Sequence, residues 1–383
     1  MRLALIGVGQ AGGKVTEAFL EYADRTDSDI VVDALAVNTA KADLLGLDRI
    51  PVEKRLLIGT DRVKGHGVGA DNELGAEIAA DDSEIVMDAV AGMPSHEIDA
   101  FLLVAGLGGG TGSGVAPYLA KELRRRYEEP VYGLGLLPGK DEGGIYTLNA
   151  ARSFQTFVRE VDNLVVYDND TMAGGTDSLA GGFTKANREL ARRFGVLFAA
   201  GETDGSAVPE QVVDASEIIN TLGSGGVSTF GYASSPIERK RGLFGGKGRP
   251  DATDATPRIL ALVRQATLGR LTLPCEITSA ERALVVVAGP PEMLSRSGVE
   301  KARTWLEEAT GTMEVRGGDF PVPDADEVSA AVLLSGVSDI PRVKELQAVA
   351  IETQRSMREI DETADDRLSD LLWSGDGELN PLF

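Results

Sequence analysis

FLLVAGLGGGTGSG, residues Phe101 to Gly114, is the segment from which the architecture of the chain follows. Its first five residues are apolar without interruption, which is typical of a strand buried on both faces of a sheet. Glycines then replace side chains in a turn that leads directly into the helical pattern VAPYLAKELRRR. Backbone N–H groups of such a turn converge at the positive end of the helix. The segment therefore predicts a phosphate-binding loop, with a flexible surface turn as the alternative.

Strand patterns alternate with helical patterns through the first half of the chain. Strands are expected at 3–6, 31–38, 55–58, 101–105, 131–138 and 163–170, and helices at 12–22, 73–91, 148–160 and after the glycine turn. This alternation predicts parallel pairing in a doubly wound sheet, whose ligands bind at the carboxyl ends of the strands. The fold class is therefore α/β, with a Rossmann-like N-terminal domain.

An amphipathic pattern from Gly182 to Ala200 predicts a long central helix. A smaller α+β domain is expected after it, with helices at 214–222, 257–268, 297–309 and 341–359 and strands at 225–233, 272–277, 282–288, 312–316 and 329–335. The segment 238–256 is predicted to be a loop. The expected division is 1–181 for the N-terminal domain, 182–205 for the central helix, 206–360 for the C-terminal domain and 361–383 for an acidic tail.

The composition is strongly acidic. Sixty Asp and Glu residues against 38 Lys and Arg give a formal charge of −22 over 383 residues. Such a charge argues against DNA, RNA and anionic membrane surfaces as partners, since clustered Lys and Arg bind these. Self-repulsion of this size is screened in molar salt, which favours a high-salt cytoplasm; an ordinary acidic cytosolic protein is the alternative.

Targeting and disulfide signals are weak. Cys275 is the single cysteine, which allows no disulfide framework. The opening run LALIGV is typical of a strand rather than of a signal peptide, and no run approaches the ~18 apolar residues of a membrane span. We therefore expect a cytoplasmic protein without direct membrane insertion.

The first strand leads into a second glycine-rich turn. Gly7, Gly9 and Gly12 match the G-x-G-x-x-G fingerprint of dinucleotide-binding proteins. Asn38 ends the next strand, where an NAD enzyme would carry Asp or Glu for the ribose. A Rossmann NAD-dependent oxidoreductase is therefore a disfavoured alternative, and a P-loop is excluded because Val15 follows Lys14.

Together the motifs resemble those of the tubulin/FtsZ superfamily, whose hallmark is GGGTGSG, here at 108–114. The other matching segments are GVGQAGG at 7–13, NTA at 38–40, GHGVGADN at 65–72, the loop at 138–143, NDTM at 169–172, GFTKANREL at 182–190 and VVDASE at 212–217. FtsZ-like chains place Arg at Tyr146, Asn at Val212 and Asp at Glu217. The Asp-x-x-Glu pattern at 214–217 is closer to that of the α-tubulin side of the superfamily. This pattern and the acidic composition together indicate a resemblance to CetZ, the tubulin-like group of haloarchaea associated with cell shape and motility.

The resemblance implies binding of GTP or GDP with Mg²⁺, the metal being carried by nucleotide and water rather than by protein ligands. The phosphates would bind the first loop, at 7–13, and the fourth, at 108–114, and the γ-phosphate would bind the third, at 65–72; NTA at 38–40 is the second loop. Glu142 would contact the ribose. Asn169, Phe183 and Asn187 would contact the base. The implied nucleotide-binding residues are Gly9, Gln10, Ala11, Gly12, Asn38, Ala70, Asp71, Asn72, Gly108, Gly109, Gly110, Thr111, Gly112, Ser113, Gly114, Glu142, Asn169, Phe183 and Asn187. For Phe183, spacing alone favours a core aromatic equally.

The resemblance further implies a GTPase that polymerises head to tail. Asp214 and Glu217 are the implied catalytic residues, acting on a water at the neighbouring subunit's nucleotide. Spacing alone favours a capping box at this position at least as well, with Asp214 as the N-cap. A nucleotide-binding structural protein without turnover is the second alternative. The basic segment 238–250 is expected to contact a neighbouring filament or, alternatively, to be a solvated loop.

Overall fold

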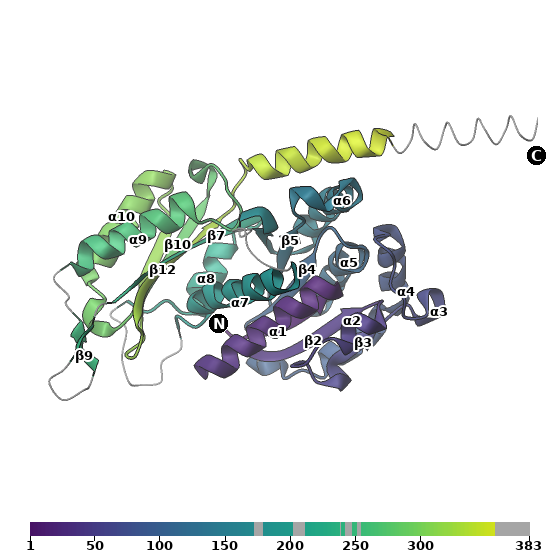
Figure 1. Ribbon diagram of the computed structural model, residues 1–383, viewed down its shortest axis with the longest axis horizontal. Helices are drawn as coiled ribbons and strands as arrows, with labels where there is room; N and C mark the ends of the chain where they lie inside the picture. The colour runs from purple at the N-terminus through teal and green to yellow at the C-terminus, as the bar shows by residue number, and fades with distance from the viewer. Residues whose placement is uncertain (172–178, 202–210, 238, 242–246, 251–253, 357–383) are drawn as a thin grey trace, which may run out of the picture.

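One ten-stranded sheet runs through both halves of the protein (Figure 1). The computed structural model describes residues 1–171, 179–201, 211–237, 239–241, 247–250 and 254–356. The strand order is β11-β10-β12-β7-β6-β5-β4-β1-β2-β3. The predicted α/β class is confirmed. The predicted domain boundaries stay predictions, and in the structure β6 joins β7 so that the sheet is continuous.

The N-terminal half of the sheet is parallel, as predicted. Its strands are β1 (Leu3–Val8), β2 (Val31–Asn38), β3 (Arg55–Leu57), β4 (Ala100–Gly106), β5 (Val131–Leu137) and β6 (Asn163–Asp168). Helices α1 (Gly9–Thr26) and α7 (Leu179–Phe198) cover one face, and α4 (Asn72–Ala91), α5 (Gly110–Arg126) and α6 (Gly144–Glu160) cover the other. Successive strand residues therefore alternate between two buried cores, which is why these strands are apolar throughout.

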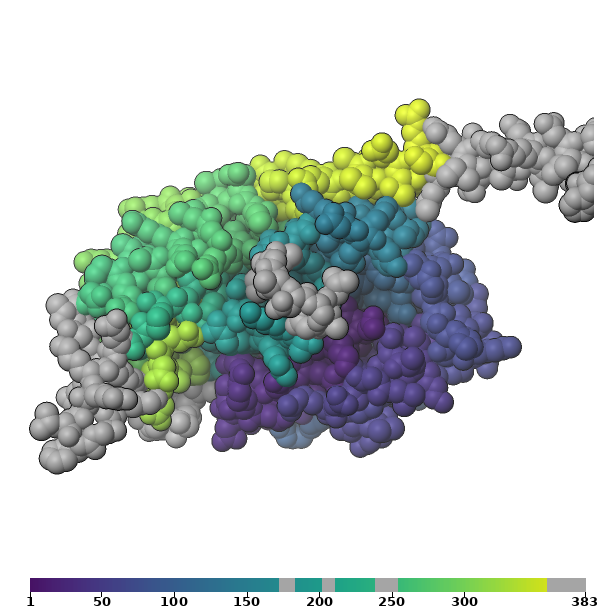
Figure 2. Space-filling view, viewed as in Figure 1, coloured from purple at the N-terminus to yellow at the C-terminus, as the bar shows by residue number. Residues whose placement is uncertain are grey.

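The C-terminal half extends the same sheet with mixed pairing. Its elements are α8 (Ala215–Leu222), β7 (Val227–Pro236), β8 (Arg239–Arg241), β9 (Lys247–Pro250), α9 (Ala255–Gly269), β10 (Arg282–Gly289), α10 (Arg296–Thr310), β11 (Val315–Pro321) and β12 (Glu327–Ser335). Strand β12 is antiparallel to both β7 and β10. A last helix begins at 341 and is described to 356. Figure 2 shows it, in yellow, running along the border of the molecule beside the segment that contains α6.

Shorter helices fill the connections. They are α2 (Lys41–Leu45), α3 (Thr60–Val63) and the 3-10 turns η1 (Val52–Lys54), η2 (Ser95–Glu97), η3 (Lys140–Glu142), η4 (Asn169–Thr171), η5 (Ile277–Ser279) and η6 (Pro291–Met293). Within the described part of the chain, no helix combines the length and the apolar composition that crossing a bilayer requires.

The strand predicted at 272–277 is wrong. Thr272 instead forms a wedge where β6 and β7 separate. Its N–H donates to the carbonyl of Phe230 at 2.7 Å, and its carbonyl accepts from the N–H of Asp168 at 2.8 Å. Thr272 thus supplies a hydrogen-bond partner to each of the two separating strands. Pro274, two residues further along, has no backbone N–H to continue this pairing. The alternating apolar pattern is the same as that of a strand, so the sequence could not distinguish the two.

Several other boundaries also differ from the prediction, and two of these differences change the assignment of a segment. The strand expected at 312–316 is β11, which continues to Pro321. The predicted loop 238–256 contains the antiparallel pair of β8 and β9 and the first turn of α9. Residues 238, 242–246 and 251–253 of that segment, and the acidic tail from 361, lie outside the described residues.

The central helix α7 connects the two edges of the parallel sheet. Its aromatic residues pack in the core, with the ring of Phe194 4.7 Å from that of Phe230. The amino group of Met1 donates to the carbonyl of Phe198, so α7 ends where the first strand begins. Its 20 residues correspond to a length of about 30 Å. The helix therefore spans the sheet from its carboxyl edge to its amino edge.

Helix α1 approaches β4 at Gly12 more closely than a side chain allows. A Cβ at Gly12 would overlap the carbonyl oxygen of Val104, whereas a Cβ at Gly13 would meet only the side chain of Leu47, at 3.3 Å. Both positions are helical, so alanine gains the same helix propensity at each. We expect Gly12→Ala to lower the free energy of unfolding by about 2 kcal/mol or more relative to Gly13→Ala, measured by denaturant titration. Equal stabilities would contradict this packing.

Candidate functional site

Two helix N-termini meet at the carboxyl edge of the sheet. Helix α1 begins at Gly9, directly after β1, and helix α5 begins at Gly110, with three residues between it and β4. Neither helix carries a side-chain cap or an acidic residue in its first turn. The two turns touch, since a Cβ at Gly9 would lie 3.0 Å from the nitrogen of Gly112. Uncapped N–H groups and two helix dipoles thus converge on one place, which is the physical requirement for binding an anion.

The glycines of the stretch 108–114 have two different roles. Gly110 and Gly114 allow close packing, because a Cβ would come within 2.5 Å of the Val68 side chain at the first and overlap the carbonyl of Asn72 at the second. Gly109 is different. It is exposed, precedes the first turn of α5, and has no atom within 4 Å of a Cβ placed on it. Gly109 therefore borders the open space in front of the helix N-terminus.

Hydrogen bonds join the second loop, 38–41, to the third, 65–72, and to the fourth, the glycine-rich loop 108–114. The N–H of Lys41 donates to the carbonyl of Gly65 at 2.9 Å, and that of Gly67 to the carbonyl of Thr39 at 3.2 Å. The hydroxyl of Thr39 in turn lies 2.7 Å from the hydroxyl of Thr111. Three loops from different parts of the sequence are thus fixed to one another beside the start of α5.

Asn149 is a site residue that the sequence analysis missed. It lies on α6 and is fully buried, and its amide donates to the carbonyl of Ala70 at 2.7 Å and to that of Gly108 at 3.1 Å. It therefore ties the third loop to the glycine-rich loop. The only available signal was an amide on the apolar side of an amphipathic helix, where it needs a buried partner.

Several predicted side chains stabilise their own loops. Asn38 is buried, accepting from the N–H of Ala40 at 3.0 Å and donating to Asp43 at 3.1 Å. Asp71 caps α4 through the N–H of Leu74, at 3.0 Å. The hydroxyl of Ser113 donates to the carbonyl of Gly109. Each of these side chains therefore fixes the backbone of its own loop.

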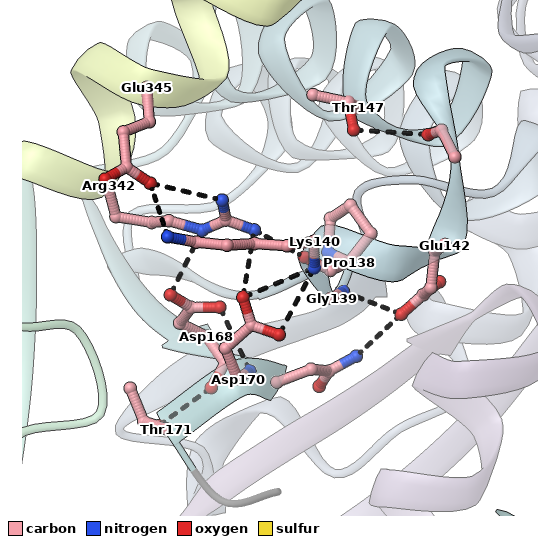
Figure 3. Close-up of polar contacts among 12 residues, drawn as sticks. Pro138, Gly139, Lys140, Glu142, Thr147, Asp168, Asp170, Thr171, Arg342 and Glu345 are labelled. Carbon is pink, nitrogen blue, oxygen red and sulfur yellow. Dashed lines mark hydrogen bonds and ion pairs between the residues drawn. The ribbon is translucent and has the colours of Figure 1, made fainter.

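The predicted ribose loop and base turn lie side by side, as Figure 3 shows. The Glu142 carboxylate accepts from the N–H of Gly139 at 2.7 Å and from the amide of Asn169 at 3.4 Å. Asp170 accepts from the N–H of Lys140 at 3.2 Å. Glu142 and Asp170 are exposed at the same edge of the sheet. The two loops after β5 and β6 thus form a second polar rim; Met172, the last residue of the NDTM motif, lies outside the described residues.

Arg342, from the last helix, is a second residue that the sequence analysis missed. Its guanidinium lies 3.2 Å from Asp168 and 3.5 Å from Asp170, and it donates to the carbonyl of Pro138 at 2.9 Å (Figure 3). Burial raises the pKa of the Asp168 carboxyl, and the Arg342 charge opposes that rise. No local pattern in the sequence signals this contact, because the helix and the loops meet only in the folded chain.

The start of the central helix carries the two residues expected at the base. Phe183 is 51% exposed, so the alternative of a core aromatic is wrong. Asn187, one turn further along, is half-buried, and Gln10 and Ala11 are exposed at the start of α1. Their predicted contacts with a nucleotide stay predictions.

Asp214 and Glu217 lie at the opposite edge of the sheet. Helix α8 ends there, since the amide of Asn163, the first residue of β6, donates to the carbonyl of Leu222 at 2.9 Å. A Cβ at Gly201, three residues beyond α7, would lie 3.1 Å from the Cα of Asp214. The length of α7, about 30 Å, therefore separates this pair from the start of that helix. A single chain does not bring the pair to its own phosphate-binding loops.

The capping alternative is confirmed for Asp214 only. Its carboxylate accepts from the N–H of Glu217 at 3.1 Å and from the hydroxyl of Ser216 at 2.5 Å, which caps α8. These hydrogen bonds, the Ser216 one first, lower the pKa of Asp214. Glu217 does not complete a capping box, because its carboxylate pairs with Arg316 at 2.7 Å. Both carboxylates are thus held by contacts within the single chain.

Strand β11 fixes the segment that leads to this pair. Gln211 exchanges two hydrogen bonds with Asp319, whose carboxylate accepts from the N–H of Gln211 at 2.7 Å and whose N–H donates to its carbonyl at 3.1 Å. Gly318 is required beside them, because a Cβ there would overlap the Gln211 carbonyl. The segment 211–214 therefore has a defined position at the amino edge.

A parallel sheet with anion-binding turns at one edge, a long central helix and an appended mixed sheet defines a tubulin-like protein. The family model described as the Tubulin/FtsZ family GTPase domain matches residues 2–177, and that of the tubulin-like CetZ C-terminal domain matches residues 176–352. The chain belongs to the tubulin/FtsZ family and, within it, to the CetZ proteins. The family assignment confirms the resemblance to tubulin-like proteins, and the alternative of a Rossmann NAD-dependent oxidoreductase is no longer needed.

Individual relatives extend over nearly the whole chain. Tubulin-like protein CetZ3 of Haloferax volcanii is 64% identical, covering 100% of both chains. The structure of CetZ1 from the same organism, a GDP-bound monomer, is 60% identical with a TM-score of 0.83, covering 92% of this chain and 100% of that one. The structure of H. volcanii CetZ2, a GTPγS-bound protofilament, is 44% identical with a TM-score of 0.84, covering 94% and 100%.

Gly109 offers a direct test of the anion site. Aspartate fits its extended backbone conformation, would cap α5, and would place a negative charge in front of both helix N-termini. We expect Gly109→Asp to weaken nucleotide binding at least about 100-fold through charge repulsion, while the free energy of unfolding stays equal or rises by about 0.5–1 kcal/mol. Fluorescent nucleotide titration and denaturant unfolding measure these two effects. Gly109→Ala is the neutral control, and undiminished binding by Gly109→Asp would contradict the assignment.

Proposed function

We propose that this protein is a GTPase that assembles head to tail and hydrolyses GTP where two subunits meet. The observation that carries the proposal is the placement of the uncapped helix N-termini and of the Asp214 and Glu217 pair at opposite edges of one sheet. The solved relatives support it, since one is described as bound to GDP and another as a protofilament bound to GTPγS. The family assignment supports a cytoplasmic, cytoskeletal role in cell shape or motility.

The binding chemistry follows from the carboxyl edge. N–H groups at the starts of α1 and α5 hold the phosphates, and the loop 70–72, fixed by Asn149, holds the γ end. Glu142 and Asn169 face the ribose and base, and Phe183 supplies an exposed ring for stacking. Mg²⁺, carried by nucleotide and water rather than by protein ligands, would supply positive charge to the phosphates.

Hydrolysis needs a group that orients the attacking water, for which a carboxylate is suited. No acidic residue lies in the first turns of α1 or α5, and Asp71 of the third loop caps α4. A second subunit stacked end to end supplies the carboxylate. Asp214 arrives ionised, as an aspartate is at neutral pH, and its capping hydrogen bonds lower its pKa further; its carboxylate accepts a hydrogen bond from the water. Glu217, oriented by Arg316, lies on the same helical face. Since this heterologous contact does not close, repeated stacking gives a filament.

The β8–β9 pair is the candidate lateral surface. It carries most of the basic segment 238–250 and projects from the edge of the C-terminal half, beyond the end of β7 (Figure 1). On an acidic protein such a projection suits a contact with the acidic surface of a neighbouring filament.

The proposal predicts how hydrolysis depends on concentration and on the carboxylates. The rate per subunit should rise with protein concentration, and Asp214→Asn and Glu217→Gln should each lower the maximal rate by about 10²–10⁴-fold. Both variants should bind GTP with wild-type affinity, because they lie at the edge that does not bind the nucleotide. Glu300→Gln, which removes an exposed carboxylate from α10, is the matched control and should hydrolyse normally.

Two results separate the alternatives. A rate per subunit that does not change with concentration would contradict an active site shared between subunits. Assembly and GTP binding without measurable turnover in the wild type would instead indicate a nucleotide-binding structural protein.

A further inference from the structure

We propose that Arg342 is a positioning residue for the nucleoside half of the nucleotide, and that the helix beginning at 341 is thereby part of the nucleotide site. The inference rests on the proposed function, because it concerns the same pocket. Arg342 does not touch the ligand in this account; it fixes the two loops that do.

The guanidinium reaches both loops at once. Its Nη2 donates to the carbonyl of Pro138 in the loop after β5. Its Nε pairs with Asp168, the last residue of β6, and its Nη2 also pairs with Asp170 in the following turn η4. Pro138 and Asp170 directly adjoin Gly139 and Asn169, the two groups that meet at Glu142. Arg342 therefore sets the spacing of the polar rim assigned to ribose and base (Figure 3).

The contact is shielded from solvent. The side chains of Arg342 and Asp168 are 10% and 5% exposed. Screening by salt is weak for buried pairs, so the cluster keeps its strength in the high-salt solution that weakens surface pairs. The rigid planar fork of arginine matches several acceptors in different directions, and the single ammonium of lysine does not.

The same helix makes further contacts with this rim. Glu345 pairs with the ammonium of Lys140 at 2.8 Å and lies 3.6 Å from Arg342. Further along, a Cβ at Gly144 would lie 3.1 Å from the hydroxyl of Thr353, so the helix packs against the start of α6. Docking of the helix and the geometry of the ribose loop are thus linked, and by reciprocity nucleotide binding must stabilise the docked helix.

The test compares GDP with 2′-deoxy-GDP in the full chain. We expect Arg342→Lys to weaken GDP binding about tenfold and to reduce the ratio of the two dissociation constants toward one, because a loosened ribose loop no longer distinguishes the hydroxyl. Arg342→Gln should have the larger effect, since it also leaves Asp168 without its charge partner. Lys344→Gln is the matched control: it removes one positive charge from the same helix, in an exposed pair with Asp339, and should change neither quantity.

Retention of the charge in Arg342→Lys keeps Asp168 neutralised, so this variant can be assayed even if Arg342→Gln unfolds. Wild-type affinity and wild-type discrimination in a folded Arg342→Lys would overturn the inference and leave the proposed function intact. A proportional loss for GDP and 2′-deoxy-GDP would also overturn it, because that result indicates general destabilisation. Failure of the wild type to bind either nucleotide would instead contradict the proposed function.

Discussion

The parallel order of β1 to β6 is the constraint on which the rest of the molecule depends. It places every strand's carboxyl end at one edge, where the turns into α1 and α5 leave their N–H groups without side-chain partners. It also places the amino ends at the other edge, where α7 ends. Asp214, the N-cap of α8, and Glu217, in its first turn, lie at that edge. The uncapped helix N-termini and the carboxylates proposed to act in hydrolysis are therefore separated by the length of one helix.

The separation of the helix N-termini from the Asp214 and Glu217 pair has consequences for assembly. In the proposed mechanism, each subunit carries the nucleotide-binding surface at one end and the reactive carboxylates at the other, so the smallest unit that brings the two together is a pair. The contact uses different surfaces on the two partners, and a pair therefore retains one free surface of each kind. Assembly and chemistry then become properties of the same interface.

The sequence predicted the features that depend on local pattern. The apolar strands, the glycine turns and the amphipathic central helix follow from spacing, and the GGGTGSG motif identified the family. Contacts between distant segments were not accessible in this way: Arg342 and Asn149 are an ordinary arginine and an ordinary amide until the fold brings carbonyls and carboxylates to them. The error at Thr272 has the same origin, because a wedge between diverging strands and a strand share one pattern. Which predicted side chains face the ligand, and which support their own loop as Asn38 does, also depends on packing.

Mixing two inactive variants tests the shared site most directly. A Gly109→Asp subunit retains its Asp214 but should bind nucleotide far more weakly than the wild type, and an Asp214→Asn subunit should bind nucleotide but supplies no carboxylate. Measured separately and then in equal amounts, at a concentration at which the wild type is active, the mixture should hydrolyse GTP at a substantial fraction of the wild-type rate while each variant alone stays near background. A mixture as inactive as its components, formed from subunits shown to co-assemble, would contradict an active site built from two chains.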